Sequence, residues 1–547
     1  MLHNPYGYRA SRRSVVMAPY GMVATSQPLA AQAGIDMLKA GGNAIDAAIA
    51  VNATLGVVEP MSCGIGGDLF AIIWDEKNAS LSGLNASGRA PYAASIDYFT
   101  RKGYDYIPDS GPLNWSVPGC VDGWECLLNR FGTKSYEEIL STAINYAEHG
   151  FPVTDIIGHD WAGSTTLLSP WSESVRVYLP NGHAPIPGEV FKNPDLAHSY
   201  RSIAEGGRDA FYEGEIADLI LSYSKEVDGL FAIEDFRDHT STWDDPVSID
   251  YRGYTVWELP PNGQGIAALQ MLNILDGYDL PALGYQTSET IHLQIEAKKL
   301  AYADRATYYA DMAFADVPVA ELISRDYADR QRQRIDPKKA LMDVPSGDPR
   351  LKRGDTVYLT VVDKDRNAIS LIQSIYRGFG SGIVPPGTGF PIQNRGQLFA
   401  LDATHRNALH PHKRPFQTII PAMVTKDGTP WLSFGLMGGD MQPQGHAQVL
   451  CNMIDFGMDV QEAGDAPRFN HSGSATPTGL PMASDGGTVA LEPGIRDEVA
   501  HTLVEMGHKV VQSIHGYGGY QAIMIDPVSG MLHGASEPRK DGCAIGY

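Results

Sequence analysis

A charged segment rich in proline and glycine runs directly into a β-branched hairpin, and this junction restricts the possible folds more than any other feature. Residues 335–355 read IDPKKALMDVPSGDPRLKRGD, a composition that cannot cover a hydrophobic core, so we expect an exposed linker. Residues 357–362 then form a strand-like run, 363–367 have turn composition, and 368–376 form a second run. The pattern predicts a linker that enters a β-sheet at Thr356.

The turn determines which residues face each other across this hairpin. A turn centred on Asp365 places Thr356 opposite Ser374, on neighbouring strand ends. A threonine hydroxyl is a weak nucleophile unless a base lies beside it. The α-amino group of an N-terminal threonine can be that base, because it titrates at about 7.7–8.0. Cleavage between Asp355 and Thr356 would create such a terminus; alternatively, Thr356 simply begins a strand.

A strand, a glycine turn and a helix are predicted in the segment that begins at Trp431, with the helix starting at about His446. Gly438 and Gly439 would let backbone N–H groups point together at a developing oxyanion, because neither residue has a side chain. The alternative is a strand-to-helix turn that binds no ligand. Residues 64–67, with the sequence GIGG, form a second glycine turn.

The rest of the chain mixes helical and strand-like patterns. Residues 28–57 predict two helices, separated by a stop signal at the Gly41–Gly42 pair. Residues 135–148 and 289–304 predict amphipathic helices, and 70–74 predicts a short apolar strand. These patterns indicate a mixed α/β chain.

Composition disfavours several classes of partner and cofactor. The 42 basic residues against 64 acidic ones give a net charge of −22, so we expect neither nucleic acid nor a membrane as partner. The sequence has no phosphate-binding loop, zinc helix or GxSxG motif, and its five cysteines lack metal-type spacing. His410 and His412 could share a strand face, but no third ligand is evident, so no metal and no cofactor are expected. The lack of a long apolar run or signal core favours a cytoplasmic protein.

A series of motifs spans nearly the whole chain: GGNAIDAAIAVNATLGVVEP, CGIGGDLF, DYRGYTVWELPPNGQG, AKKLAYADR, GDTVYLTVVDKDRNAISL, FGSGIV, KRP, GLMGGD, DAPRF and GASEPR. In this order they resemble the motifs of the γ-glutamyltranspeptidase family of N-terminal-nucleophile hydrolases. The resemblance implies a four-layer αββα fold and self-cleavage between Asp355 and Thr356. It therefore implies a large region, 1–355, that ends in the linker 335–355, and a small catalytic region, 356–547. The two fragments would form a heterodimer, and two such heterodimers could in turn form a dimer.

The resemblance also implies catalytic roles for four residues. Thr356 heads the motif TVYLTVVDKD and matches the nucleophile of the family. Ser374 matches the hydroxyl residue that supports the nucleophile, in agreement with the hairpin pairing. Gly438 and Gly439 match the glycines that stabilise the oxyanion.

The substrate pocket departs from the family pattern at the positions that bind an α-amino acid. Ser87 stands where an arginine would bind the α-carboxylate, with Arg89 two residues away. Leu398 replaces the aspartate that would bind the α-ammonium group. An ammonium group left unpaired in a partly dry site costs about 1–3 kcal/mol. These departures disfavour strict γ-glutamyl specificity.

Further substitutions add positive charge and an aromatic ring to the pocket. Arg395 replaces a glutamine, Gln417 and Thr418 replace a serine pair, and Tyr376 replaces an asparagine. Arg395 would favour a carboxylate or another anionic acyl group. Similar replacements are found in the cephalosporin (glutaryl) acylase and oxamate amidohydrolase branch of the family.

The sequence therefore predicts a self-processing amidohydrolase that transfers a small acyl group (γ-glutamyl-like, glutaryl or related) from an amide substrate to Thr356 and then mainly to water. One alternative is genuine γ-glutamyl transfer from glutathione to amino acids or peptides. The other is a non-catalytic relative that stays uncleaved and acts as a binding protein.

Overall fold

Two seven-stranded sheets are stacked face to face at the centre of the fold. The computed structural model describes residues 13–342, 344, 356–474, 476–479 and 483–547. Sheet A has the strand order β1-β18-β17-β13-β12-β9-β8, and sheet B the order β19-β2-β10-β11-β3-β4-β7. Sheet A comprises β1 Val16–Ala18, β8 Val247–Tyr251, β9 Tyr254–Glu258, β12 Ala422–Lys426, β13 Thr429–Met437, β17 Gly519–Ile525 and β18 Leu532–Ala535. Sheet B comprises β2 Met22–Thr25, β3 Asp68–Asp75, β4 Ser80–Ala86, β7 Thr242–Asp244, β10 Val357–Val362, β11 Ala368–Ser374 and β19 Cys543–Gly546.

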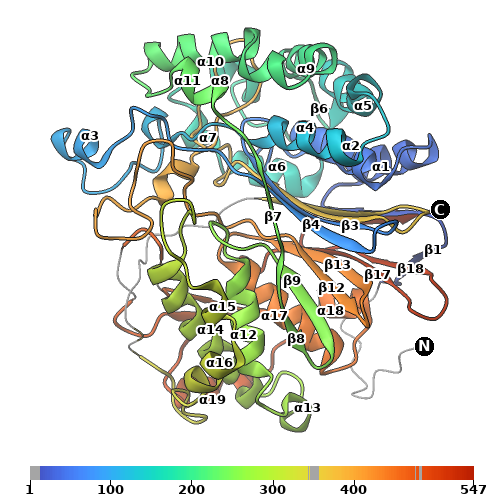
Figure 1. Ribbon diagram of the computed structural model, residues 1–547, viewed down its shortest axis with the longest axis vertical. Coiled ribbons are helices and arrows are strands. Elements are labelled where there is room, and N and C mark those ends of the chain that lie inside the picture. The colour runs from blue at the N-terminus through green and yellow to red at the C-terminus, as the bar shows by residue number, and fades with distance from the viewer. Residues whose placement is uncertain (1–12, 343, 345–355, 475, 480–482) are drawn as a thin grey trace.

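Helices cover the outer side of each sheet (Figure 1). On the side of sheet B lie α1 Pro28–Lys39, α2 Ala44–Val58, α4 Cys120–Phe131, α5 Tyr136–His149, α6 Asp155–Ala162, α7 Thr165–Leu168, α8 Ser172–Tyr178, α9 Pro194–Tyr212, α10 Glu215–Glu226 and α11 Ile233–Arg237. On the side of sheet A lie α12 Gly265–Leu275, α13 Leu280–Leu283, α14 Ser288–Tyr308, α15 Val319–Leu322, α16 Arg325–Arg332, α17 Met441–Ile454 and α18 Val460–Asp465. The other elements are α3 Ile96–Arg101, α19 Asp497–Glu505, the 3₁₀ turns Pro112–Asn114 and Arg395–Leu398, the pair β5 Phe151–Pro152 and β6 Val190–Phe191, and a small sheet of β14 Phe469–Ser472, β15 Thr488–Leu491 and β16 Lys509–Gln512.

Three apolar cores hold these layers together. The core between the sheets contains residues of β2, β3, β10 and β11 on one side and of β12, β13, β17 and β18 on the other. A second core joins sheet B to its helices, and a third joins sheet A to its helices. Each sheet is thus apolar on both faces, which is the condition for a four-layer sandwich. The αββα architecture implied by the sequence is confirmed.

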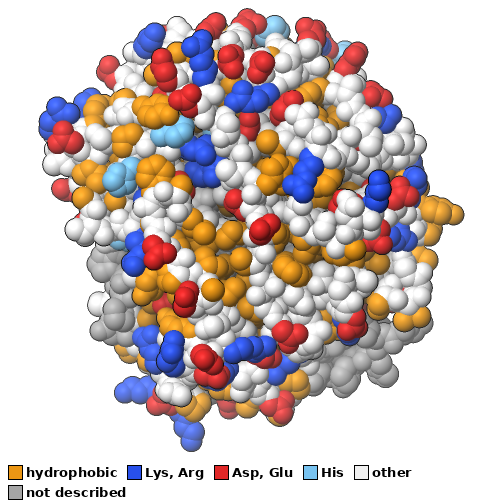
Figure 2. Space-filling view, in the orientation of Figure 1, with side chains coloured by type: hydrophobic (Ala, Val, Ile, Leu, Met, Phe, Trp, Pro, Cys, Tyr) orange, Lys and Arg blue, Asp and Glu red, His pale blue; other side chains and the backbone are white. Residues whose placement is uncertain are grey.

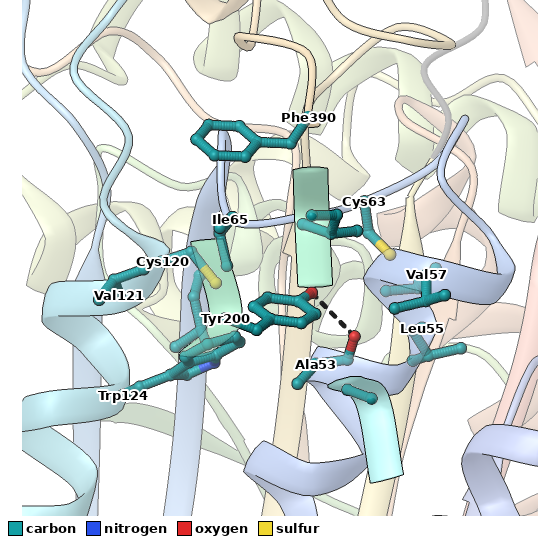
Figure 3. Close-up of a cluster of buried hydrophobic side chains, with 14 of the residues drawn as sticks. Ala53, Leu55, Val57, Cys63, Ile65, Cys120, Val121, Trp124, Tyr200 and Phe390 are labelled. Carbon is teal, nitrogen blue, oxygen red and sulfur yellow. Dashed lines mark hydrogen bonds between the residues drawn. The ribbon is translucent and has the colours of Figure 1, made fainter. Parts of the chain in front are cut away.

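The core over sheet B is built around helix α2, which begins and ends where the sequence predicts. Asn43 and Asp46 form a capping box at its start, in which each side chain accepts a hydrogen bond from the backbone of the other residue. All residues of the helix are buried. Figure 3 shows how Tyr200 of α9 reaches this helix, where its hydroxyl donates a hydrogen bond of 2.9 Å to the carbonyl of Ala53.

The predicted hairpin and its register are also confirmed. Strands β10 and β11 are antiparallel, and their pairing runs from Val357 opposite Gln373 to Val362 opposite Ala368. The turn is closed by a hydrogen bond of 3.0 Å from the Asp363 amide to the Asn367 carbonyl. The same register, extended by one residue before β10, brings Thr356 opposite Ser374, the last residue of β11.

The predicted start of the helix that follows the glycine turn is wrong. Helix α17 begins at Met441 instead of about His446. Proline usually disrupts a helix, but Pro443 is part of α17. It lies in the first turn, where its missing N–H would have no intrahelical partner.

Two further expectations need correction. Helix α14 is not amphipathic: it is buried on nearly all sides, including Lys298 and Lys299. Of the linker, the structure describes residues 335–342 and 344, and this part is not uniformly exposed. Ala340 and Val344 are buried, and Ala340 donates a backbone hydrogen bond of 2.8 Å to Met506. Residues 345–355 lie outside the described part of the chain.

Charged side chains of both signs are interspersed over the face shown in Figure 2. The surplus of acidic residues is therefore not gathered into one block on this face. In the described ranges, no helix combines the length and the apolar character that crossing a membrane requires.

Both sheets combine strands from before and after residue 355. In sheet B, β10 lies between β2 and β11, and β11 lies between β10 and β3. In sheet A, β12 pairs with β9, and β1 pairs with β18. The last strand, β19, pairs with β2 near the start of the chain. Separating the two segments would break strand pairs in both sheets at once.

We therefore expect that cleavage between Asp355 and Thr356 leaves a single particle. On a denaturing gel the cleaved protein should give two bands, whereas size-exclusion chromatography in native buffer should give one peak that contains both fragments. Separation into two native peaks would contradict the interleaved topology. The uncleaved chain serves as the size control.

Candidate active site

Thr356 lies at the wall of a large cavity. The residue immediately precedes β10, is almost fully buried, and lines a cavity of about 910 Å³. This volume lies at the upper end of the range of about 300–1,000 Å³ that is usual for ligand sites. The wall near Thr356 also contains Tyr376, Thr418, Gly438, Gly439 and Asp440.

The hydroxyl of Thr356 donates a hydrogen bond of 3.3 Å to Ser374 Oγ. Ser374 Oγ also accepts a hydrogen bond of 2.8 Å from the Tyr376 amide. Tyr376 has a φ of 78°, a left-handed conformation that is costly for a residue with a side chain. The hydrogen bond to Ser374 helps to hold this conformation, so the ring at the cavity wall and the hydroxyl pair are fixed by the same atom.

The glycine turn follows β13 and forms the next part of the wall. Gly438 has a φ of 121° and Gly439 a φ of 58°, which explains why both are glycines. The side-chain amide of Gln264 donates hydrogen bonds of 3.0 Å to the Gly439 carbonyl and 2.7 Å to the Thr418 carbonyl. Arg305 donates a hydrogen bond of 2.6 Å to the carboxylate of Asp440, which adjoins the turn. These contacts hold the turn beside Thr418.

Arg395 lies directly behind the cavity wall, and its side chain is fully buried. Its guanidinium donates a hydrogen bond of 2.8 Å to Thr418 Oγ1, and its central carbon is 4.4 Å from the centre of the Tyr376 ring. Burial lowers the pKa of Arg395 to about 10, so the side chain stays charged at neutral pH. Nε and one terminal nitrogen have no hydrogen-bond partner among the described residues. A buried cation with unused hydrogen-bond donors is expected to attract an anion.

The negative charge of Asp68 on β3 raises the pKa of Arg395, against the larger effect of burial. It accepts hydrogen bonds of 2.7 Å from Gln393, 2.8 Å from the Gly88 amide and 2.6 Å from Gln417. Burial raises the pKa of Asp68, against the charge of Arg395 and these donors. The oxygens of Asp68 are thus already engaged within the protein.

The other predicted binding residues lie in the framework rather than at the cavity wall. Ser87 is buried and donates a hydrogen bond of 2.7 Å to Asn85. Arg89 donates to the Thr240 carbonyl at 2.9 Å. Gln417 is buried and is held by Asp68. The structure thus brings Tyr376, Thr418 and Thr356 to one cavity, with Arg395 behind them, and leaves Ser87, Arg89 and Gln417 away from its wall. Asp355 lies outside the described residues.

The histidines considered as metal ligands do not share a strand. His410 and His412 lie in a loop, where His412 stacks on Tyr92 with a centroid distance of 4.6 Å. In the described ranges, one group has ligand atoms close enough for a metal: His292, Glu296 and His508. Lys299 already supplies a cation there, because its ammonium is 2.9 Å from Glu296.

Comparisons with known proteins agree over almost the whole chain. Residues 30–547 match the family described as gamma-glutamyltranspeptidase. The chain belongs to the γ-glutamyltranspeptidase family. It is 38% identical over 530 residues to the glutathione hydrolase-like YwrD proenzyme of Bacillus subtilis (strain 168), covering 96% of this chain and 98% of the relative. It is 36% identical over 540 residues to the acylase ACY 1 proenzyme of Pseudomonas sp. (strain V22), covering 96% and 93%.

A solved structure supports the same conclusion about this γ-glutamyltranspeptidase-family chain. The crystal structure of cephalosporin acylase from Bacillus halodurans is 43% identical, covers 99% of this chain and 98% of its own, and superposes with a TM-score of 0.91. The chain is therefore an enzyme of the hydrolase and acyltransferase type, with the fold of an N-terminal-nucleophile hydrolase. Its relatives are proenzymes, which agrees with an amidohydrolase that is made as a precursor.

Sequence reasoning gave no role to Gln264, Arg305 and Asp440 of this γ-glutamyltranspeptidase-family site. Each lies in a motif that carries the family resemblance: PPNGQG, AKKLAYADR and GLMGGD. Arg305 and Asp440 are 135 residues apart in the chain, so no local pattern connects them. The available signal was a charged or polar residue at or next to the end of each motif.

A second glycine turn, predicted from GIGG, also supports the site of this family member. The side chain of Gln373 bonds both the amide and the carbonyl of Gly64, at 2.8 and 2.7 Å. A Cβ on Gly67 would lie 2.3 Å from the Ser374 carbonyl oxygen. The turn therefore packs directly on the backbone that carries the Ser374 hydroxyl.

Replacing Gly67 by Ala should displace Ser374 and lower the free energy of unfolding by about 1–3 kcal/mol, as overpacking usually does. Turnover should fall with it, because the Thr356–Ser374 hydrogen bond would be misaligned. Denaturant unfolding and kcat measure the two effects. Gly163→Ala is the control, since Gly163 has a φ of −61° and the nearest atom would be 3.3 Å from the new Cβ. Equal effects of both variants would contradict this packing role.

Proposed function

We propose that the protein is a self-processing amidohydrolase that cleaves a small acyl amide through an ester on Thr356, with water as the main acceptor. The observation that carries the proposal is that Thr356, hydrogen-bonded to Ser374, and the glycine turn line one cavity, with the buried Arg395 behind its wall at Thr418. Family membership supports the reaction type, whereas the pocket supports the choice of acyl group.

The first reaction would be the cleavage of the chain itself. Thr356 Oγ1 attacks the carbonyl carbon of Asp355, and the peptide C–N bond breaks as the amide nitrogen takes up a proton. The resulting ester between Asp355 and Thr356 is opened by water. The products are a carboxylate on Asp355 and a free α-amino group on Thr356. The large region 1–355 and the small region 356–547 then stay together as a heterodimer.

Turnover of substrate would use the same atoms. The α-amino group of Thr356 accepts the hydroxyl proton while Oγ1 attacks the substrate carbonyl carbon. The backbone N–H groups of Gly438 and Gly439 stabilise the oxyanion, and the proton passes to the departing amine. Water then attacks the acyl ester, which releases the acid and restores the threonine hydroxyl. Ser374 orients Oγ1 throughout.

The acyl group would carry a carboxylate, as a glutaryl group does. Because Arg395 donates to Thr418 Oγ1, the Thr418 hydroxyl keeps its own proton for an acceptor in the cavity. The buried charge of Arg395 behind this hydroxyl strengthens such a hydrogen bond. The aspartate that would pair with an α-ammonium group is replaced by Leu398, which is buried in the same apolar core as Tyr376. The pocket therefore supports an anionic acyl group more than a zwitterionic γ-glutamyl group.

Thr356→Ala should abolish both self-cleavage and turnover, because no hydroxyl remains to attack either carbonyl. On a denaturing gel the variant should give one band at the full mass of 59.3 kDa, whereas the wild-type protein gives two. Thr356→Ser keeps the hydroxyl and should retain part of both reactions. A Thr356→Ala protein that still splits would overturn self-processing, and an uncleaved wild-type protein would favour the non-catalytic alternative.

Arg395→Met should raise KM for a glutaryl amide about ten- to hundredfold, as expected for the loss of a charge-assisted interaction. Steady-state kinetics with glutaryl and γ-glutamyl p-nitroanilides and release of ammonia from oxamate measure the acyl preference. Arg377→Met is the matched control, because Arg377 lies 5.9 Å from the same tyrosine ring and pairs with Asp109 at 3.0 Å. A wild-type preference for γ-glutamyl substrates would support genuine γ-glutamyl transfer instead.

A further inference from the structure

The cavity extends well beyond the residues that would bind a small acyl group. Its wall continues from the glycine turn to residues of β14, β15 and β16 and to helix α6. Among the described residues, four lysine and arginine side chains line it: Lys298, Lys509, Arg539 and Lys540. Three of them pair with carboxylates, since Lys509 contacts Asp485 at 2.9 Å, Arg539 contacts Glu492 at 2.6 Å and Lys540 contacts Asp160 at 2.9 Å.

Lys298 differs from these three, because its contacts within the described part of the chain are to uncharged groups. Its ammonium donates hydrogen bonds of 3.0 Å to the His471 carbonyl and 2.8 Å to Ser474 Oγ. It also lies 3.1 Å from His471 Nδ1 and 4.0 Å from the centre of the Tyr302 ring. The nearby carboxylate of Asp440 is engaged by Arg305 at 2.6 Å.

The surroundings of Lys298 favour the binding of an anion beside it. The side chain is buried, and two cations, Arg305 and Lys299, act on it from the same helix. Burial, Arg305 and Lys299 together lower the pKa of Lys298 well below its usual value, against the attraction of Asp440. A buried ammonium without a carboxylate partner is costly, and an anion in the cavity would remove this cost.

One hydrogen bond of Lys298 can be exchanged for a ligand. His471 Nε2 donates to the Gly486 carbonyl at 2.9 Å, so His471 Nδ1 acts as an acceptor. Ser474 Oγ lies 3.4 Å from this same nitrogen and can donate to it in place of the ammonium. That exchange frees one N–H of Lys298 to bind a ligand at the cavity wall.

We propose that Lys298 binds a carboxylate on the amine half of the substrate, the part that leaves when Thr356 is acylated. The proposal rests on the proposed function, because that reaction defines the two halves. Arg395 adjoins Thr418 and Tyr376, whereas Lys298 adjoins His471 of β14 and Ser474. Arg395 thus lies behind one part of the cavity wall and Lys298 lines another part, which suits a substrate with one carboxylate on each half.

Two substrates with the same acyl group test this assignment. Glutaryl-p-nitroanilide and glutaryl-3-carboxy-4-nitroanilide differ by a single carboxylate on the leaving aniline. Wild-type enzyme should prefer the carboxylated anilide about ten- to hundredfold in kcat/KM. Lys298→Met should reduce that ratio to about one. Lys299→Met is the matched control: Lys299 is the adjacent buried lysine, pairs with Glu296, and should leave the ratio as it is.

Binding of the released amine gives a readout without turnover. Calorimetry should show that 5-amino-2-nitrobenzoate binds wild-type enzyme at least about tenfold more tightly than 4-nitroaniline does. A wild-type preference below about twofold in both experiments would overturn the role of Lys298, whatever the variants do. An equal fall of the kcat/KM ratio in Lys298→Met and Lys299→Met would also overturn that role. Failure of the proposed function looks different, since neither anilide would then be hydrolysed and the Thr356→Ala change would have no effect.

Discussion

The hydrogen-bond register of β10 is the constraint on which the rest of the site depends. The strand lies between β2 and β11, so its register is fixed from both sides. Its two faces are buried in different cores, one between the sheets and one under the helices. A slip of one residue would exchange these faces, which makes it prohibitively costly. Because Thr356 immediately precedes this strand, its position relative to Ser374 follows from the packing of the whole sandwich.

The features that could be predicted from sequence were those that depend on neighbouring residues. The turn at 363–367 determines the pairing of β10 and β11, and the Asn43–Asp46 capping box starts α2; both are local. The errors came from tertiary context. The charge pattern of α14 does not predict that Lys298 and Lys299 are buried. Their burial depends on partners that are distant in sequence, in β14 and in the linker. The contact between Arg305 and Asp440 is equally distant in sequence.

The charges around the cavity are held with different kinds of partner. Lys509 and Asp485 are half exposed and form an ordinary ion pair, which contributes little to stability. Arg395 and Lys298 are buried and bond to hydroxyl and carbonyl groups instead. Burying a charge without an ion-pair partner costs free energy as long as no ligand is bound. Within the described ranges neither positive charge forms a direct ion pair, so a negatively charged ligand would interact strongly with each.

The combination of early and late strands within both sheets has a consequence for the timing of activation. Strand β10 can take its place only when β2 and β3, made first, and β11, made later, are all present. A chain still emerging from the ribosome therefore lacks the geometry that would bring a hydroxyl against the bond before it. Under the proposed mechanism, Thr356 gains its free α-amino group only after the sandwich has folded. Folding itself then prevents premature hydrolysis, without a separate inhibitor domain.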